Sequence, residues 1–190
     1  MASPLAHSLV GLGVGAAYFL PRATALRDLA TAAWRLRSTL AGCILLSNAP
    51  DIDYLFGLPN GNLNQNHQYA THTLVWVMVL VLGVWLIWRR RAPGHGWAQL
   101  ILLSTLGLGH LGIDLLTEDS RAPFGLLIFW PFSDQRVYLP EWTIFWGLRK
   151  STWASVFSWQ NVAAGARELA LTLPLPLWVL WYKLRRSSSL

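Results

Sequence analysis

The run of residues 73 to 88, TLVWVMVLVLGVWLIW, contains no charged side chain and ends directly at Arg89, Arg90 and Arg91. Such a run is typical of a membrane helix. The composition agrees, because 54% of the residues are hydrophobic and only 13% are charged. The 12 tryptophans suit an aromatic belt at the level of the lipid head groups, although a Trp-rich soluble core is the alternative. We therefore predict an integral membrane protein.

Four other apolar runs accompany this one, at residues 5–20, 38–49, 98–116 and 169–182. Pro174 and Pro176 predict a kink in the last run, and glycines in the first predict close helix contacts. Residues 22–37 alternate arginines with apolar residues, which is typical of an amphipathic helix on a membrane surface. The prediction is an all-α, polytopic bundle of about four to five transmembrane helices, forming a single domain over residues 1–190.

The positive charges of the chain predict its orientation. If the five runs alternate in direction, ten of the 15 Lys and Arg residues fall on one side, in segments 22–37, 89–91 and 183–186. The positive-inside rule makes that side cytoplasmic, in the bacterial inner membrane. The net charge of +6 is then explained by topology, and we expect membrane lipids rather than nucleic acid as partners.

The same alternation brings histidines and aspartates together at the opposite, non-cytoplasmic face. These residues are His7, Asp51, Asp53, His67, His72, His110 and Asp114. His110 and Asp114 are four positions apart, so on a helix they project from one face and can bind one ion. Cys43 is the single cysteine, so any metal must use imidazole and carboxylate ligands. This ligand set favours zinc, with manganese or iron as alternatives.

Several roles in this cluster stay open from the sequence. A single histidine near a helix end is more often a hydrogen-bonded residue than a ligand, but the convergence of four favours a metal site. His67 and His72 are five positions apart, which predicts that one is a ligand and the other an outer or substrate-facing group. Asp53 could bridge a second ion or orient a histidine. Arg121 could hold an anionic substrate or simply pair with a neighbouring carboxylate.

The chain resembles the LexA-regulated, membrane-bound, metal-dependent hydrolases of bacterial inner membranes. The resemblance rests on six elements: Ala6-His7-Ser8, Pro50-Asp51-Ile52-Asp53-Tyr54, the segment 66–73, Gly109-His110-Leu111-Gly112-Ile113-Asp114, and the segments 121–125 and 130–133. Gln68 follows His67 where that family usually has arginine, which departs from its pattern. The order of these residues is also similar to zinc phospholipase C. That similarity implies a main ion held by Asp51, one of His67 and His72, His110 and Asp114, with His7 near a second ion that shares Asp114.

The expected function is hydrolysis of an ester or phosphoester of a lipid or lipid-linked substrate, using one or two divalent ions. The metal would activate a water molecule, with Asp53, His67 and Arg121 as catalytic residues. One alternative is a divalent-cation transporter, which would place ionisable groups nearer the middle of the membrane. Another is a non-enzymatic protein whose metal only ties helix ends together.

Overall fold

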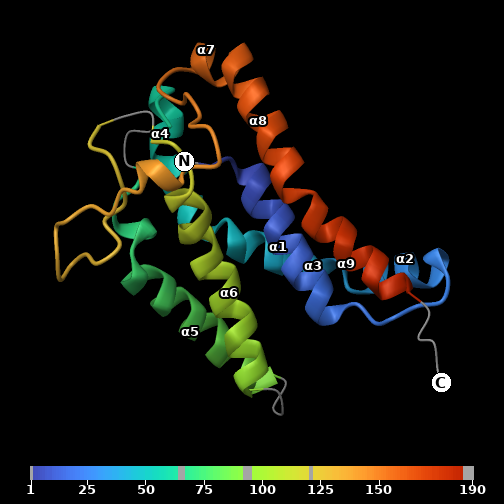
Figure 1. The fold of residues 1–190 in the computed structure, drawn as a ribbon. Helices are drawn as coiled ribbons and strands as arrows, with labels where there is room; N and C mark the ends of the chain where they lie inside the picture. Colours follow the sequence, from blue (N-terminus) through green and yellow to red (C-terminus); the bar gives the residue numbers. More distant parts are fainter. Residues whose placement is uncertain (1, 64–66, 92–95, 120–121, 186–190) are drawn as a thin grey trace.

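The computed structural model describes residues 2–63, 67–91, 96–119 and 122–185, and helices dominate this part of the chain (Figure 1). The longer helices are α1 (Pro4–Phe19), α2 (Leu26–Arg35), α3 (Arg37–Ser47), α5 (Leu74–Arg91), α6 (Gly96–Leu115), α8 (Trp159–Thr172) and α9 (Pro174–Leu184). The short ones are η1 (Ala49–Asp53), α4 (Tyr54–Gly57), η2 (Leu58–Asn60), η3 (Ala70–His72), η4 (Pro140–Trp142) and α7 (Trp153–Val156). The expected all-α class is confirmed. Two isolated β-bridges are the only β structure in these residues.

Helix α1 occupies the middle of the fold, where it contacts α3, α6, α8 and α9. Its glycines allow the approach, because a Cβ at Gly11 would lie 2.8 Å from Ser47 Cβ and 3.0 Å from the Cys43 carbonyl oxygen of α3. A Cβ at Gly13 would similarly meet Leu175 of α9. The close helix contacts predicted from the glycines of this segment are therefore present.

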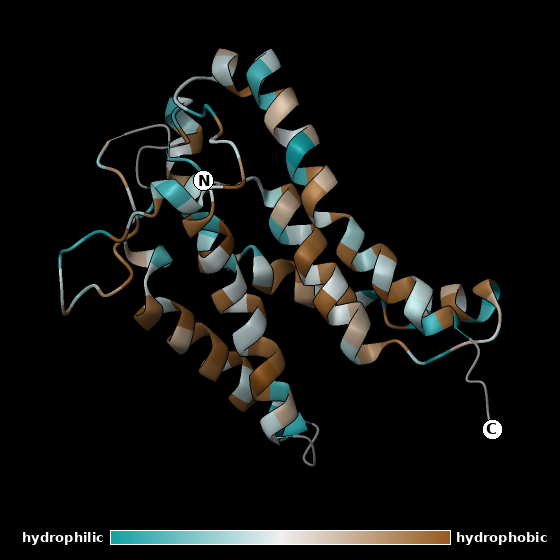
Figure 2. Cartoon of the chain, viewed as in Figure 1, coloured by the Kyte–Doolittle hydropathy of each residue, from teal (hydrophilic) through white to brown (hydrophobic). Residues whose placement is uncertain are grey.

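Helices α5 and α6 form an apolar hairpin beside this group. Val77 and Val81 of α5 pack against Leu103 and Leu106 of α6 within the largest hydrophobic cluster of the described residues. Figure 2 shows hydrophobic residues along most of both helices, whereas hydrophilic residues gather mainly at the ends of helices and in the connecting segments. The run predicted at 73–88 is thus a helix of nearly the expected bounds.

The C-terminal run is divided as its prolines predict. Helix α8 ends at Thr172 and α9 begins at Pro174, which has no N–H to continue the α8 hydrogen bonds. In the segment predicted to form a surface helix, α2 covers Leu26–Arg35 and buries Leu29 while Trp34 stays exposed.

The number of membrane crossings is not settled by the helix lengths. Within the described residues, α6 is the one helix long and apolar enough to cross a membrane by length and composition, and α1 is apolar but shorter. Helix α5 has 18 residues but includes three arginines. The expectation of four to five spans therefore remains a prediction.

Several helix ends meet at one end of the molecule. The start of α1, the last turn of α6 and the segment around α4 lie close together there, whereas the end of α5 and the start of α6 lie at the opposite end of that hairpin and α2 packs near the end of α1 (Figure 1). This arrangement brings together the polar residues at these helix ends.

Candidate metal centre

Each predicted ligand sits where a helix begins or ends. His7 lies in the first turn of α1, which Ser3 caps by accepting a hydrogen bond from Leu5 N–H. His110 and Asp114 lie in the last turns of α6. Asp51 and Asp53 lie in η1, which contains Pro50 and follows α3 directly, and His72 ends η3. All seven predicted histidines and aspartates are buried in one cluster.

Four atoms of this cluster lie close enough together to share one metal ion. His110 Nε2 lies 3.3 Å from His72 Nε2, 3.8 Å from Asp51 Oδ1 and 3.1 Å from Asp114 Oδ2. His72 Nε2 lies 3.6 Å from Asp51 Oδ1 and 3.5 Å from Asp114 Oδ2. Ligand atoms of a tetrahedral zinc ion, with bonds of about 2.0–2.2 Å, lie roughly 3.3–3.6 Å apart. Both imidazole nitrogens therefore lie at ligand spacing from each other and from the two carboxylate oxygens, so one small cation could lie between them.

The other ring nitrogens of these two histidines are held by neighbouring groups. His110 Nδ1 lies 2.8 Å from the carbonyl oxygen of Ser47, an acceptor, so Nδ1 carries the proton and leaves Nε2 with a free lone pair. His72 Nδ1 lies 3.2 Å from Asp53 Oδ2 and 3.1 Å from Thr71 Oγ1. Carboxylates and carbonyls in this position are the usual orienting partners of metal-bound histidines.

His67 differs from His72 because both of its nitrogens have partners outside the four-atom set. Nδ1 lies 2.8 Å from Asp53 Oδ1, and Nε2 lies 2.8 Å from the hydroxyl of Tyr54, whose ring stacks on the imidazole. Burial lowers the pKa of His67 to about 4, against the opposing hydrogen bond to Asp53. Of the two roles left open by the sequence, this geometry favours His72 as a ligand and His67 as the outer group.

His7 and Asp114 form a second, adjacent group with His110. Asp114 turns Oδ2 toward His72 and His110, and its Oδ1 lies 3.4 Å from His7 Nε2 and accepts a hydrogen bond from Ala2 N–H at 3.2 Å. The His7 ring stacks on that of His110 with centroids 3.8 Å apart. Asp114 is thus shared between two groups of possible metal ligands.

The electrostatics of the cluster favour a bound cation. Asp51, Asp53 and Asp114 are at most 8% exposed. Burial opposes ionisation of Asp53, but hydrogen bonds from His67 and His72 hold the pKa of its carboxyl well below the usual range. Burial likewise opposes protonation of His72, yet the surrounding carboxylates raise its pKa well above the ordinary value.

Unsatisfied polar atoms point the same way. Asp51 Oδ2, Asp114 Oδ2 and both ring nitrogens of His7 are buried without a hydrogen-bond partner. Buried polar atoms normally have partners, because leaving one without costs about 1–3 kcal/mol. Three overlapping groups here have the spacing of metal ligands: His7 with His110 and Asp114, Asp51 with His72 and His110, and Asp53 with His67 and His72. The buried cluster could therefore hold a metal ion.

Two residues beside the cluster, Lys150 and Glu168, were not predicted as functional. The Lys150 ammonium is buried, stands over the Tyr54 ring and donates to the Tyr54 hydroxyl and to the Ala2 carbonyl oxygen. Glu168 is fully buried and accepts hydrogen bonds from Ser3 N–H and Oγ. An acidic residue within an apolar segment is the one sequence signal that marks Glu168. Arg121, predicted to hold an anion, lies outside the described residues.

The fold and the cluster define a class: an all-helical protein whose helix ends gather buried histidines and aspartates able to hold a divalent metal. The model of the family described as YdjM inner membrane protein matches residues 1–187, so the chain belongs to that family. The predicted location in the bacterial inner membrane is thereby supported. No curated protein and no solved structure matches the chain.

Proposed function

We propose that this protein is a membrane-bound, metal-dependent hydrolase of an ester or phosphoester. The observation that carries the proposal is the spacing of His72 Nε2 and His110 Nε2, which lie 3.3 Å from each other and 3.1–3.8 Å from Asp51 Oδ1 and Asp114 Oδ2. A divalent ion bound there would polarise the scissile group and bring the pKa of a water molecule near neutrality. Zinc fits the ligand set best, with manganese or iron as alternatives.

The chain's own residues supply a route for protons. Asp53 binds His67 and His72 on its two oxygens, and His67 in turn faces the hydroxyl of Tyr54. His67 Nε2 also lies 3.8 Å from Asp51 Oδ1, at the edge of the ligand set. In the proposed reaction, His67 accepts a proton from the attacking water or donates one to the leaving group, while Asp53 fixes the orientation of its ring.

Lys150 supplies a positive charge beside these groups. The buried Lys150 ammonium contacts Tyr54, which in turn contacts His67. An anionic substrate bound at the candidate metal ligands would therefore lie near this ammonium. In the proposal it shares the anion-binding role with Arg121. A phosphoester, which keeps its negative charge throughout hydrolysis, would gain more from this charge than a neutral carboxylic ester.

The position of the cluster supports a site on the periplasmic side. Arg89–Arg91 end α5 at the opposite end of the molecule from the cluster (Figure 1). By the positive-inside rule the basic end is cytoplasmic. We propose that α1, α3, α5, α6 and the α8–α9 pair cross the membrane, with α2 on its cytoplasmic surface.

A structural metal is the second candidate, and the same geometry favours it. Four protein ligands would close a tetrahedral site, whereas catalytic zinc keeps a position for water. The hydrolase needs that position, which arises if Asp114 is drawn toward a second ion at His7 or if the first ion becomes five-coordinate. The two candidates therefore differ in whether an added anion can reach the metal.

The test uses the detergent-purified protein loaded with cobalt(II), whose visible spectrum reports its coordination. We expect added phosphate to change the spectrum, and the zinc-loaded protein to hydrolyse bis-p-nitrophenyl phosphate or p-nitrophenyl butyrate. Asp114→Asn is the negative control for both assays, in which we expect neither the spectral change nor hydrolysis. A spectrum insensitive to phosphate together with no hydrolysis would favour the structural metal, and absence of bound metal after reconstitution would refute both.

A further inference from the structure

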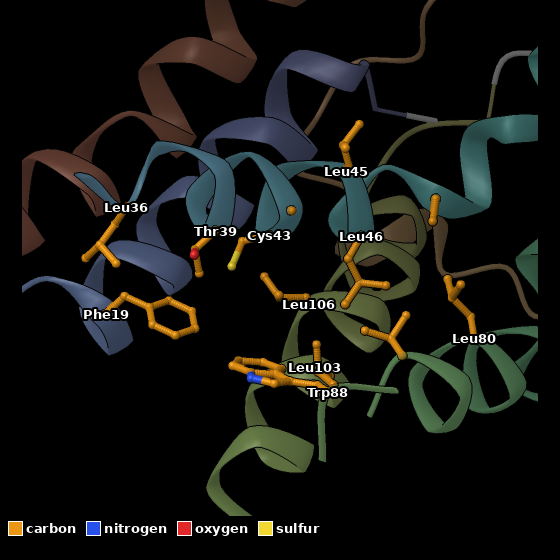
Figure 3. A pocket seen from close by; sticks show the side chains of 13 residues that line it. Phe19, Leu36, Thr39, Cys43, Leu45, Leu46, Leu80, Trp88, Leu103 and Leu106 are labelled. Carbon is orange, nitrogen blue, oxygen red and sulfur yellow. The ribbon is translucent and has the colours of Figure 1, made fainter. Parts of the chain in front are cut away.

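An apolar groove of about 630 Å³ runs between α3 on one side and the α5–α6 hairpin on the other. Figure 3 shows Cys43 and Leu46 of α3 directed toward Leu103 and Leu106 of α6, with Trp88 of α5 beside them. The volume lies within the range of about 300–1,000 Å³ found for small-molecule sites. The groove is therefore large enough for a ligand of substantial size.

The lining of the groove selects an apolar ligand. None of its residues carries a charge, and Thr39 supplies the one hydroxyl. Leu45, which lines the groove, is 71% exposed, so the opening itself is apolar. In an inner membrane protein, a groove with such an opening faces hydrocarbon rather than water.

The groove is long enough for one lipid acyl chain. Its lining extends along α3 from Leu36, just before the helix, to Ala49, just after it. Thirteen residues at the helical rise correspond to roughly 20 Å. An acyl chain within one leaflet, half of the hydrocarbon core, spans roughly 15 Å. A single extended acyl chain therefore fits within this space.

One end of the groove adjoins the metal centre. Ala49 precedes Asp51 by two residues, and Leu106 precedes His110 by one turn of α6. Leu46 also lines the groove, and the next residue, Ser47, holds the His110 ring through its carbonyl oxygen. A lipid whose acyl chain lies in the groove would thus direct its polar head group toward the buried histidines and aspartates.

We propose that the groove binds one acyl chain of a membrane lipid and thereby presents the lipid's head-group esters to the metal centre. This inference rests on the hydrolase function proposed above and assigns its substrate class as acyl lipids. The bound acyl chain supplies binding energy by burial of its apolar surface, and it holds the lipid head group at one depth in the membrane. Specificity would then come from the groove, and reactivity from the cluster.

Gly42 provides a direct way to fill the groove. It lines the groove, and a Cβ added there meets no atom within 4 Å, so Gly42→Phe places a ring in the space without a clash at its Cβ. Gly83 on α5 is the matched control, because a Cβ there also meets no atom within 4 Å and Gly83 does not line the groove. The pair separates occupation of the groove from the general effect of adding an aromatic ring.

The experiment uses full-length protein in phosphatidylcholine vesicles that contain a phosphatidylcholine with a diazirine in one acyl chain. After illumination, mass spectrometry of peptides locates the cross-links. We expect them to concentrate on residues 36–49 and 80–88, to be lost in Gly42→Phe and to persist in Gly83→Phe. Cross-links spread evenly over the apolar helices and unchanged in Gly42→Phe would overturn the proposal.

A second probe with the diazirine in the head group tests the orientation of the lipid. We expect its cross-links on residues 49–54, and cross-links confined to the opposite end of the groove would overturn the assignment of the substrate. His110→Ala separates the two proposals, because His110 does not line the groove. If cross-links from the acyl-chain probe persist in His110→Ala, the groove binds lipid whether or not the wild-type protein hydrolyses any substrate. Lipid binding and hydrolysis are therefore tested separately, and either proposal can fail alone.

Discussion

His110 Nδ1 donates a hydrogen bond to the carbonyl oxygen of Ser47 at 2.8 Å, which ties the last turns of α6 to the end of α3. The carbonyl is available because it lies at the C-terminal end of α3, where no further turn of helix uses it. The bond selects one tautomer of His110 and directs its Nε2 toward His72 and Asp114. The candidate metal site is therefore built by packing two helix ends together.

The first prediction concerns the two residues of α6 that face the cluster. His110→Ala and Asp114→Ala should each lose stoichiometric bound zinc or manganese, since each removes one of the four closely spaced ligand atoms. Elemental analysis of the purified protein measures this directly. Thr105→Val is the control, because Thr105 is exposed on the same helix and its hydroxyl bonds only the Ile101 carbonyl oxygen. Equal metal content in all three variants would refute the site.

A second prediction concerns Asp53, which orients His67 and His72 rather than joining the four-atom set. Asp53→Asn should keep the metal at saturation but weaken its affinity by about 10–100-fold, the usual effect of losing an orienting carboxylate. Titration against a competing chelator measures this change. Asp134→Asn removes an exposed carboxylate and should leave the affinity unaltered. Complete loss of metal in Asp53→Asn would instead make Asp53 a ligand.

Much of the arrangement of the helices can be predicted from the sequence, because apolar runs mark the long helices. Residues 73–88 and 98–116 correspond closely to α5 and α6, and the break at Pro174 lies where proline requires it. The gathering of His7, Asp51 and His110 follows from alternating direction alone, since that places the start of one run beside the ends of two others. Helix order and helix ends are thus readable without any structure.

The finer features depend on tertiary contacts that leave no pattern in the chain. His67 and His72 do not lie on a common helix, so their spacing could not decide which one faces the other ligands. Lys150 belongs to an irregular segment far along the chain, and its contact with Tyr54 arises only when that segment folds back over α4. The groove along α3 likewise depends on how far α5 and α6 stand from it, which hydropathy does not encode.

The third prediction tests the hydroxyl of Tyr54, which joins Lys150 to His67. Tyr54→Phe should keep the bound metal, because no ligand is removed, and should lower the hydrolysis rate by about 100-fold if His67 transfers protons. It should also lower the melting temperature, since Lys150 is left buried with one carbonyl partner. Tyr69→Phe serves as the control, as Tyr69 is 48% exposed. Unchanged kcat in Tyr54→Phe would contradict the proton route.

The fourth prediction concerns Gly11, where α1 comes closest to α3. In Gly11→Ala the new methyl would lie 2.8 Å from Ser47 Cβ and 3.0 Å from the Cys43 carbonyl oxygen, so α1 must move away. Overpacking of this kind costs about 1–3 kcal/mol, and the melting temperature in detergent should fall accordingly. Gly83→Ala meets no atom within 4 Å and should be neutral or slightly stabilising.

The same shift of α1 should reach the metal centre, because His7 lies one turn before Gly11 and its carbonyl oxygen accepts a hydrogen bond from Ser47 Oγ at 2.9 Å. If Asp114 bridges two ions, Gly11→Ala should weaken the ion beside His7 more than the ion at His72 and His110. Metal titration would then show one of two binding steps shifted to higher concentration. A single step that is unaffected by the substitution would limit the site to one ion and leave His7 outside it.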